Sequence, residues 1–499
     1  MPNLGGNPVQ PVMCADFPLA ERQPRTAPAR RAICFTHAFF LFTLIVAGVA
    51  ASLEDVDAED TLPMAGLVFA ALALWTLWSW FQLHGTLIEP YGLFLMASWT
   101  FNGGQVFLEV LHLNSNGILG GVFSPFTTLK TEYLVALGIC AMHMGALWAA
   151  GSGKSTSRAN LWRSTARQDL AWHTRWVGWF LLLVSIGPAI WVFWDAAQTV
   201  LSGGYMSLYQ RTLDIGLATG PRVLANFLIP SALLLLAGSK AKRIGVVTSA
   251  AITVAGSLAM FFLGGRGAAA TALVAYVWLY SRTIRPIPAK LLILPALLLG
   301  FVVFPLVRAV RDTRGLDRTS VDFVTNAWSA IDNPVVGSLA EMGSSMNTVA
   351  YTLELVPTAR PFDGGVSYLY ALLAGIPNVA WSVHPTTAHG TLSAWLVYTV
   401  MPYAAANGSG LGYSFLAEAY ENFGWIGVPL VLLVTGWIAG RLSDAVRGRS
   451  DPAILALAAT LLLTAILYAR AETADMVRNV CWYSILPYLL VRLLSGVRR

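Results

Sequence analysis

Long apolar stretches follow one another along most of the chain, and polar connections separate them. A helix needs about 17–25 mostly apolar residues to cross the hydrocarbon core of a bilayer. Segments that fit this length lie at 33–52, 62–83, 90–111, 130–150, 174–197, 221–238, 244–263, 267–283, 289–310, 423–441, 452–470 and 476–495. The pattern predicts an all-α polytopic membrane protein with about 12 transmembrane helices. Asn102-Gly103-Gly104 interrupts the third segment and favours a bent or re-entrant helix there.

Composition supports this prediction. Hydrophobic residues make up 56% of the 499 residues and charged residues only 12%, whereas a soluble domain carries about 25% charged residues. Soluble, fibrous and disordered classes are therefore excluded. The 18 Trp and 16 Tyr suit interfacial aromatic belts. The four cysteines form no closely spaced pair, so neither a disulfide framework nor a thiolate metal site is indicated.

Positive charge lies in alternate connections between the predicted spans. Because cytoplasmic loops are enriched in Lys and Arg, these connections and both termini are expected on the cytoplasmic side of the membrane. The net charge of +6 then needs no nucleic acid partner. The predicted organisation is a disordered basic tail (1–32), spans one to nine (33–310), a periplasmic loop (311–422) and spans ten to twelve (423–499).

The periplasmic loop is too long for a passive connection. It holds ten Trp and Tyr residues, and prolines divide it. Short helices are expected at 338–355, 366–375 and 391–401, over the outer ends of the spans. Such a loop can cover a cavity at the membrane surface that suits a substrate with a lipid tail and a polar head.

Arginines on the predicted outer face are the first candidates for chemistry. Ionisable residues at membrane depth are costly and usually functional, and arginine binds phosphate in a bidentate manner. One arginine lies within a Gly-Gly-Arg-Gly junction at 264–267; a tight turn with a snorkelling side chain is the alternative. Interfacial anchoring and ion pairing are the alternatives for the others. The predicted diphosphate-binding residues are Arg266, Arg308, Arg311, Arg470 and Arg478.

A reaction at a hydroxyl also needs a proton acceptor. Histidine titrates near neutral pH, and the loop offers His384 and His389. Glu341 and Glu418 lie among apolar neighbours, where burial would make them effective bases. The alternative for the histidines is a polar side chain at the surface. The alternative for the glutamates is helix capping or a hydrogen bond to the backbone. Glu341, His389 and Glu418 are the candidate catalytic residues.

Two further motifs carry no function. The segment 151–156 ends like a nucleotide-binding P-loop, but Trp148 stands where that motif requires its first glycine. The seven histidines share no metal-ligand spacing with a carboxylate. The sequence therefore implies no metal and no cofactor.

Several segments resemble the bacterial O-antigen polysaccharide polymerases of the Wzy type. The resemblance covers roughly residues 260–440 in motif and the whole chain in topology, and its fold is expected to be similar to that of GT-C glycosyltransferases. The segments that carry it are 264–267, 341–344, 351–357, 365–369 and 408–427.

The resemblance implies a reaction between two undecaprenyl-diphosphate-linked glycans at the periplasmic face. A hydroxyl of one repeat unit attacks the anomeric carbon of the other glycan, and the lipid diphosphate leaves without help from a metal. Arginines would hold the diphosphate, and Glu341, His389 or Glu418 would accept the proton. Membrane lipids and a chain-length regulator protein are the further expected partners.

Three other functions are the alternatives, and the sequence separates the first of them poorly from a polymerase. An O-antigen ligase would use the same kind of site. A glycosyltransferase that uses lipid-phosphate sugars would explain the acidic first loop, but that loop is short. A flippase or transporter usually shows two related halves, and the long loop between spans nine and ten makes this chain asymmetric.

Overall fold

A computed structural model describes the protein at residues 27–53, 56–114, 117–150, 164–205, 207–210, 219–240, 242–312, 325–326, 328–329, 331, 333–378, 381–408, 410–447 and 451–496. Throughout these residues the regular structure is helical, without a strand. The first half contains α1 (Ala27–Leu53), α2 (Ala58–His84), α3 (Pro90–Val110), η1 (Ile118–Gly121), α4 (Pro125–Ala149), α5 (Ser164–Gly203), α6 (Ser207–Gln210), α7 (Thr219–Ala225) and α8 (Leu228–Gly238).

The second half continues with α9 (Arg243–Phe262), α10 (Arg266–Thr283), α11 (Ala289–Leu298), η2 (Leu299–Val303) and α12 (Phe304–Asp312). A group of short helices follows: α14 (Pro334–Met342), α15 (Ser345–Leu355), α16 (Val366–Leu373), α17 (Pro385–His389), α18 (Leu392–Val400) and α19 (Pro402–Ala406). The chain then returns to long helices with α20 (Phe415–Val446), α21 (Pro452–Tyr468), α22 (Thr473–Val480), η3 (Cys481–Ile485) and α23 (Leu486–Gly496).

The all-α polytopic fold is confirmed. Within the described residues, 8 helical segments are long and apolar enough to cross a membrane: α1, α2, α4, α5, α7–α8, α9, α11–α12 and α20. The other four predicted segments, α3, α10, α21 and α22–α23, are also helical. The total of about 12 spans stays a prediction.

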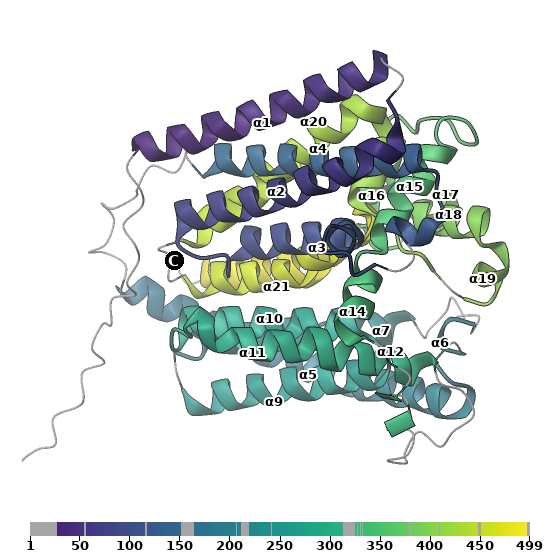
Figure 1. Ribbon diagram of the computed structural model, residues 1–499. Coiled ribbons are helices and arrows are strands. Elements are labelled where there is room, and N and C mark those ends of the chain that lie inside the picture. Colours follow the sequence, from purple (N-terminus) through teal and green to yellow (C-terminus); the bar gives the residue numbers. More distant parts are fainter. Residues whose placement is uncertain are drawn as a thin grey trace, which may run out of the picture.

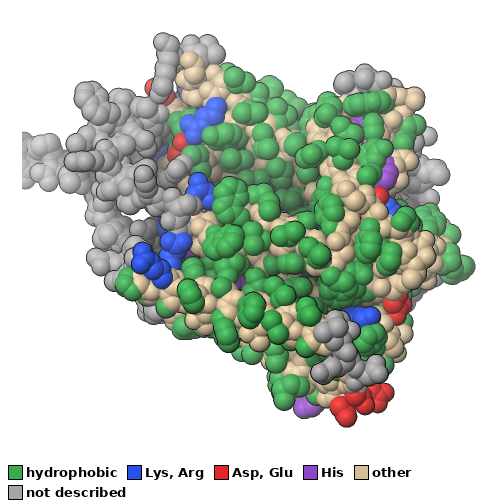
Figure 2. Space-filling model, turned by 90° about the horizontal axis from the view of Figure 1, so that it is seen from above, with side chains coloured by type: hydrophobic (Ala, Val, Ile, Leu, Met, Phe, Trp, Pro, Cys, Tyr) green, Lys and Arg blue, Asp and Glu red, His purple; other side chains and the backbone are tan. Residues whose placement is uncertain are grey.

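The long helices lie side by side, and the short helices gather at one end of them (Figure 1). The described C-terminus lies at the opposite end (Figure 1). Seen from above, hydrophobic side chains cover the broad middle, and most visible Lys and Arg side chains lie toward the end with the C-terminus (Figure 2). This distribution is the one expected for a bilayer-embedded bundle with its positive end in the cytoplasm.

Two apolar cores hold the bundle together. The first surrounds α4, in whose apolar stretch 89% of the residues are buried, and α20 packs along the length of α4. Close backbone contact makes this possible, because a Cβ at Gly145 or Gly436 would fall within 2 Å of a carbonyl oxygen on the other helix. The second core surrounds α8, with α5, α10 and α21 against it.

Three expectations about local structure were wrong. The third span is one uninterrupted helix, α3, so Asn102-Gly103-Gly104 does not bend it or make it re-entrant. The helix expected at 338–355 is broken, because α14 ends before Gly343 and α15 starts at Ser345. The predicted N-terminal tail is too long, since α1 begins at Ala27; residues 1–26 lie outside the described part.

Candidate arginine–carboxylate site

The Gly-Gly-Arg-Gly junction forms the tight connection between α9 and α10. Gly264 has a φ of +80°, and a Cβ there would lie 2.5 Å from the ring of Tyr205. Only glycine fits this backbone without strain. Arg266 is the first residue of α10, and its side chain is 15% exposed. The turn therefore presents an inward-facing guanidinium at the end of the bundle where the short helices gather.

Arg266 and Arg308 converge on one carboxylate. The Arg266 guanidinium donates to both oxygens of Glu341 through Nη1 and Nη2, with an Nη1–Oε2 distance of 2.9 Å. It also donates to the carbonyl oxygen of Phe304, 3.1 Å away. Nη1 of Arg308 lies 3.5 Å from Oε2 of Glu341. Three segments far apart in the sequence thus bring two guanidiniums around a single anion.

Glycines bring α3 and α14 close enough to place Glu341. A Cβ on Gly104 would lie 2.7 Å from the carbonyl oxygen of Leu339, and a Cβ on Gly343 would lie 2.6 Å from the Gln105 nitrogen. The Gln105 amide donates to the carbonyl oxygen of Ala340 at 2.9 Å. The glycines of the third span therefore serve helix packing at the residue next to Glu341.

The same stretch of α3 contacts the turn between α21 and α22. Asn102 donates from Nδ2 to the carbonyl oxygen of Ala469 at 2.8 Å and accepts from the Ser414 hydroxyl at 2.6 Å. The Arg470 guanidinium lies over the Phe101 ring, 5.4 Å from its centroid. One helix segment, 101–105, therefore contacts neighbours of Glu341, of Glu418 and of Arg470.

Glu418 is buried at the start of α20 and is fully engaged. Its Oε2 accepts from the backbone nitrogen and the hydroxyl of Thr473, both at 2.7 Å. Its Oε1 accepts from the Ser367 hydroxyl at 3.3 Å. These bonds join α16 and α22 to α20, so Glu418 holds the short helices onto the bundle.

Below these helices, α20 changes direction at Gly424, which has a φ of +63°. A Cβ at this position would lie 3.2 Å from the Phe362 ring. The backbone nitrogen of Gly364 donates to the carbonyl oxygen of Asn422 at 3.0 Å. The loop before α16 is therefore seated on the kink, at the start of the predicted tenth span.

A model of the O-antigen polysaccharide polymerase Wzy family matches residues 33–498, nearly the whole chain. The chain belongs to that family. Searches among curated proteins and among solved structures found no match. The match makes the chain an O-antigen polymerase of the membrane, with a glycosyltransferase type of activity on lipid-linked repeat units.

Two of the remaining predicted site residues of this Wzy-family chain, His389 and Arg478, lie on other elements. His389 ends α17, and its ring stacks on Tyr370 with centroids 4.2 Å apart. Arg478 makes a 2.8 Å ion pair with Asp475, and both side chains are more than half exposed. Arg311 belongs to α12, but its side chain lies outside the described part. The structure thus brings Arg266, Arg308 and Glu341 together and places His389 and Arg478 elsewhere.

Sequence reasoning missed a buried ion pair beside Glu418. The Arg360 Nε lies 2.9 Å from Oε1 of Glu421, whose side chain is fully buried. The Arg360 guanidinium also stacks over the Trp395 ring, 4.9 Å from the centroid. The three-residue spacing of Glu418 and Glu421 puts both on one face of α20, and that spacing was the available signal.

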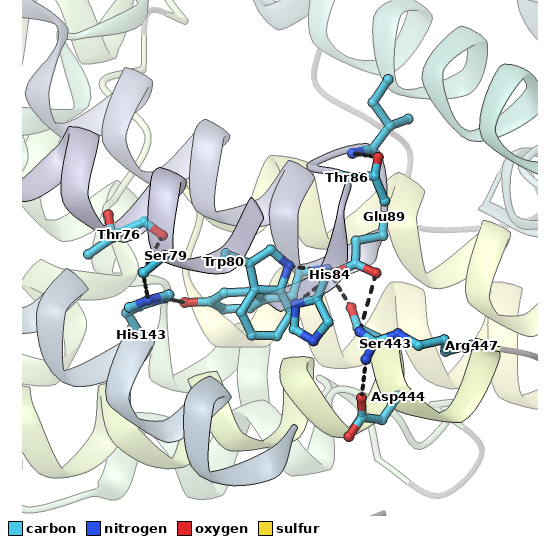
Figure 3. Close-up of polar contacts among 12 residues, drawn as sticks. Thr76, Ser79, Trp80, His84, Thr86, Glu89, His143, Ser443, Asp444 and Arg447 are labelled. Atoms are coloured by element: carbon cyan, nitrogen blue, oxygen red, sulfur yellow. Dashed lines mark hydrogen bonds and ion pairs between the residues drawn. The ribbon is translucent and has the colours of Figure 1, made fainter. Parts of the chain in front are cut away.

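At the other end of α20, a second polar cluster joins α2, α3 and α20 (Figure 3). Glu89 accepts from the Trp80 indole, and its carboxylate lies 3.6 Å from His84 and 3.7 Å from Arg447. Ser443 accepts from the Tyr91 backbone nitrogen at 2.8 Å. Burial raises the pKa of Glu89 to about 7, against the opposing influence of Arg447. This cluster fixes the end of the bundle remote from the arginine site.

No set of three or more His, Cys, Asp or Glu side chains within the described ranges is close enough to hold a metal ion. The electrostatics of the arginine site instead suit an anion, because a planar guanidinium matches the oxygens of a phosphate or carboxylate.

Proposed function

We propose that this chain joins polyprenyl-diphosphate-linked oligosaccharide repeat units at the periplasmic face of the bacterial inner membrane. A sugar hydroxyl of one lipid-linked glycan attacks the anomeric carbon of the other. A new carbon–oxygen bond forms, and the bond to the diphosphate breaks with its electron pair leaving on the phosphate oxygen. The hydroxyl proton passes to a base of the protein.

The convergence of Arg266 and Arg308 on Glu341 carries this proposal. Two guanidiniums around one carboxylate make a site that suits a doubly charged diphosphate, with the glutamate occupying the place of the anion. Positive charge held at the leaving group stabilises the transition state, where negative charge develops on the diphosphate. In this scheme the arginines supply that charge, so no metal is required.

Glu341 is the proton acceptor that this arrangement favours. Its partner Arg266 is the group that a diphosphate would bind, so substrate binding would release its oxygens. Glu418 instead accepts from a backbone nitrogen and two hydroxyls, which a substrate would not displace. His389 lies on the exposed helix α17.

The test is an in vitro reaction of the purified chain in detergent with synthetic undecaprenyl-diphosphate repeat units, no nucleotide and a metal chelator. The products are resolved on a gel, and Arg266→Ala and Arg266→Lys are run beside the wild type. Lys130→Ala is the matched control, because Lys130 is an exposed cation on α4 that lies over the Phe126 ring.

A ladder of glycan lengths from the wild type and Lys130→Ala, lost in Arg266→Ala and strongly reduced in Arg266→Lys, supports the proposal. A product formed only when lipid A core is added would make the chain a ligase. Translocation of the lipid-linked unit in proteoliposomes without any new glycosidic bond would make it a flippase. Either result contradicts the polymerase proposal.

A further inference from the structure

An apolar groove of about 980 Å³ opens between α20 and α21. These two helices are consecutive, but they pack against different partners. α20 packs along α4, whereas α21 packs against α10, α8 and α3. Because consecutive helices diverge into different cores, the space between them stays open along the bundle.

The groove is built from one stripe on each helix. The stripe on α20 repeats every three or four residues from Phe423 to Leu442, and the stripe on α21 repeats every four residues from Leu457 to Ala465. These spacings put the lining side chains on a single face of each helix. Ile426 and Leu430 are 75% and 61% exposed, so the groove is accessible from the side.

The length of the groove distinguishes between kinds of lipid. From Ile426 to Leu442 the helix rises about 24 Å at 1.5 Å per residue. One leaflet of the hydrocarbon core is only about 15 Å thick, half of about 30 Å. The groove therefore extends beyond the depth of one phospholipid tail and suits a single chain that continues into the opposite leaflet.

Two side chains with polar groups line the end of the groove that lies under the short helices. Tyr368 and Thr473 line it there. The Tyr368 hydroxyl is buried and has no hydrogen-bond partner among the described residues. Burial raises the pKa of Tyr368 far above its ordinary value, and the neighbouring carboxylates of Glu418 and Glu421 raise it further, so this hydroxyl stays protonated. Arg470 lies in the turn that precedes α22.

We propose that this groove binds the polyprenyl chain of one lipid-linked substrate, with the phosphate end of the lipid toward the short helices. The apolar length matches a tail longer than one leaflet, and the groove leads to the end of the bundle where the short helices gather (Figure 1). The inference rests on the proposed function only for the choice of lipid. The site lies on helices other than those that carry Arg266 and Arg308.

The experiment uses photoreactive polyprenyl phosphates and the full chain in phospholipid nanodiscs. One probe carries a diazirine near the phosphate, and the other carries it near the far end of the tail. A phospholipid with a diazirine in its acyl chain is the comparison. Cross-linked peptides are mapped by mass spectrometry, with unlabelled undecaprenyl phosphate as competitor. Turnover is not needed for the readout.

Two substitutions fill the groove at different heights. Ala465→Trp, near the Tyr368 end, should reduce labelling by both polyprenyl probes about tenfold, the change that corresponds to 1.4 kcal/mol of binding free energy. Ala439→Trp, toward the other end of α20, should reduce labelling by the tail-end probe and leave the probe near the phosphate unaffected. Leu183→Trp is the control, because Leu183 is 77% exposed on α5. Labelling is compared only for variants whose melting temperature equals that of the wild type.

Labelling of α20 and α21 that undecaprenyl phosphate competes away, with the expected response to the two groove substitutions, supports the inference. Equal labelling by the phospholipid probe, labelling mainly at other helices, or no effect of Ala465→Trp would overturn it. Specific labelling in a chain that forms no glycan ladder would contradict the proposed reaction but support the groove as a lipid site. A glycan ladder without labelling of the groove would support the reaction and contradict the groove.

Discussion

At the scale of single residues, the state of Glu341 is the central feature. A carboxylate between Arg266 and Arg308 neutralises charge that would otherwise be left poorly solvated at the end of the bundle. It also keeps both guanidiniums aimed at the position that an anion would take. On the proposed function, the same contact holds both guanidiniums in the orientation that a diphosphate would need.

Replacing Glu341 by glutamine tests its proposed role as base. Glutamine keeps the shape of the side chain but cannot accept the proton, so kcat should fall about 10²–10⁴-fold, the usual contribution of general acid–base catalysis. Binding of the lipid-linked substrate should be retained, because the competing negative charge is gone. Steady-state rates and KM of Glu341→Gln and of Glu418→Gln separate the two carboxylates. Full activity of Glu341→Gln would contradict the assignment.

Sequence alone could predict Arg266, Arg308 and Glu341 as separate candidates but not their contact. Ionisable residues near apolar segments stand out in a membrane protein. Which of them meet depends on helix packing, and the alternatives at His389 and Arg478 carried the same local signal. Arg360 was missed because its partner, Glu421, is 61 positions away and no local pattern joins the two.

At the scale of elements, the contact of α3 with α14 controls where Glu341 lies. Gly104→Ala would push a methyl group to 2.7 Å from a backbone carbonyl oxygen, which cannot move aside as a flexible side chain can. We expect a loss of about 1–3 kcal/mol in the free energy of unfolding, the usual cost of overpacking. Polymerase activity should fall as well, because the displaced helix carries Glu341.

The matched control for Gly104→Ala is Gly337→Ala. Gly337 lies in α14, and a Cβ there would meet nothing within 4 Å. This substitution should leave activity unchanged and leave the melting temperature unchanged or slightly higher, because alanine favours a helix. Equal behaviour of the two variants would show that the close contact is not needed.

The cluster around Glu89 predicts a pH dependence of stability. Its pKa rises from 4.5 to about 7 on folding, so the folded chain binds more protons than the unfolded chain between these values. The stabilisation is complete below about pH 4.5 and is lost as the pH rises toward 7. Melting temperatures of the wild type should therefore fall across this window relative to Glu89→Gln. Parallel profiles for the two proteins would contradict the prediction.

The positions of the long helices were predictable, because apolar segments of spanning length are a strong signal. Breaks and close contacts were not. The glycines of α3 were interpreted as a flaw in that helix, but they accommodate a neighbour. Gly343 separates α14 from α15 because the chain must turn against α3, which the local sequence does not reveal.

At the scale of the whole molecule, the account requires the short helices to face the periplasm. A cysteine-free chain with Thr358→Cys should react with an impermeant maleimide in intact cells once the outer membrane is permeabilised. Arg285→Cys should react only after lysis. Both positions are exposed in the structure. The reverse pattern would invert the orientation and place the arginine site on the wrong face.

The two proposed substrate contacts lie on different parts of the bundle. The arginine site is built by α10, α12 and α14, and the groove by α20 and α21. The segment of α3 at 101–105 contacts Ala340, next to Glu341, and Ala469, at the end of α21. A polymerase must hold two lipid-linked glycans at once, and this separation would allow it.

The most direct test of the central claim is the affinity of the purified chain for radiolabelled undecaprenyl diphosphate without any glycan. Arg266→Ala/Arg308→Ala is compared with Lys130→Ala and with the wild type at fixed ionic strength. Charge-assisted hydrogen bonds contribute about 1.5–3 kcal/mol each, so loss of the two arginines should weaken binding at least about a hundredfold, while Lys130→Ala binds as the wild type does. Equal affinity in all three proteins would contradict the assignment of the diphosphate to this site.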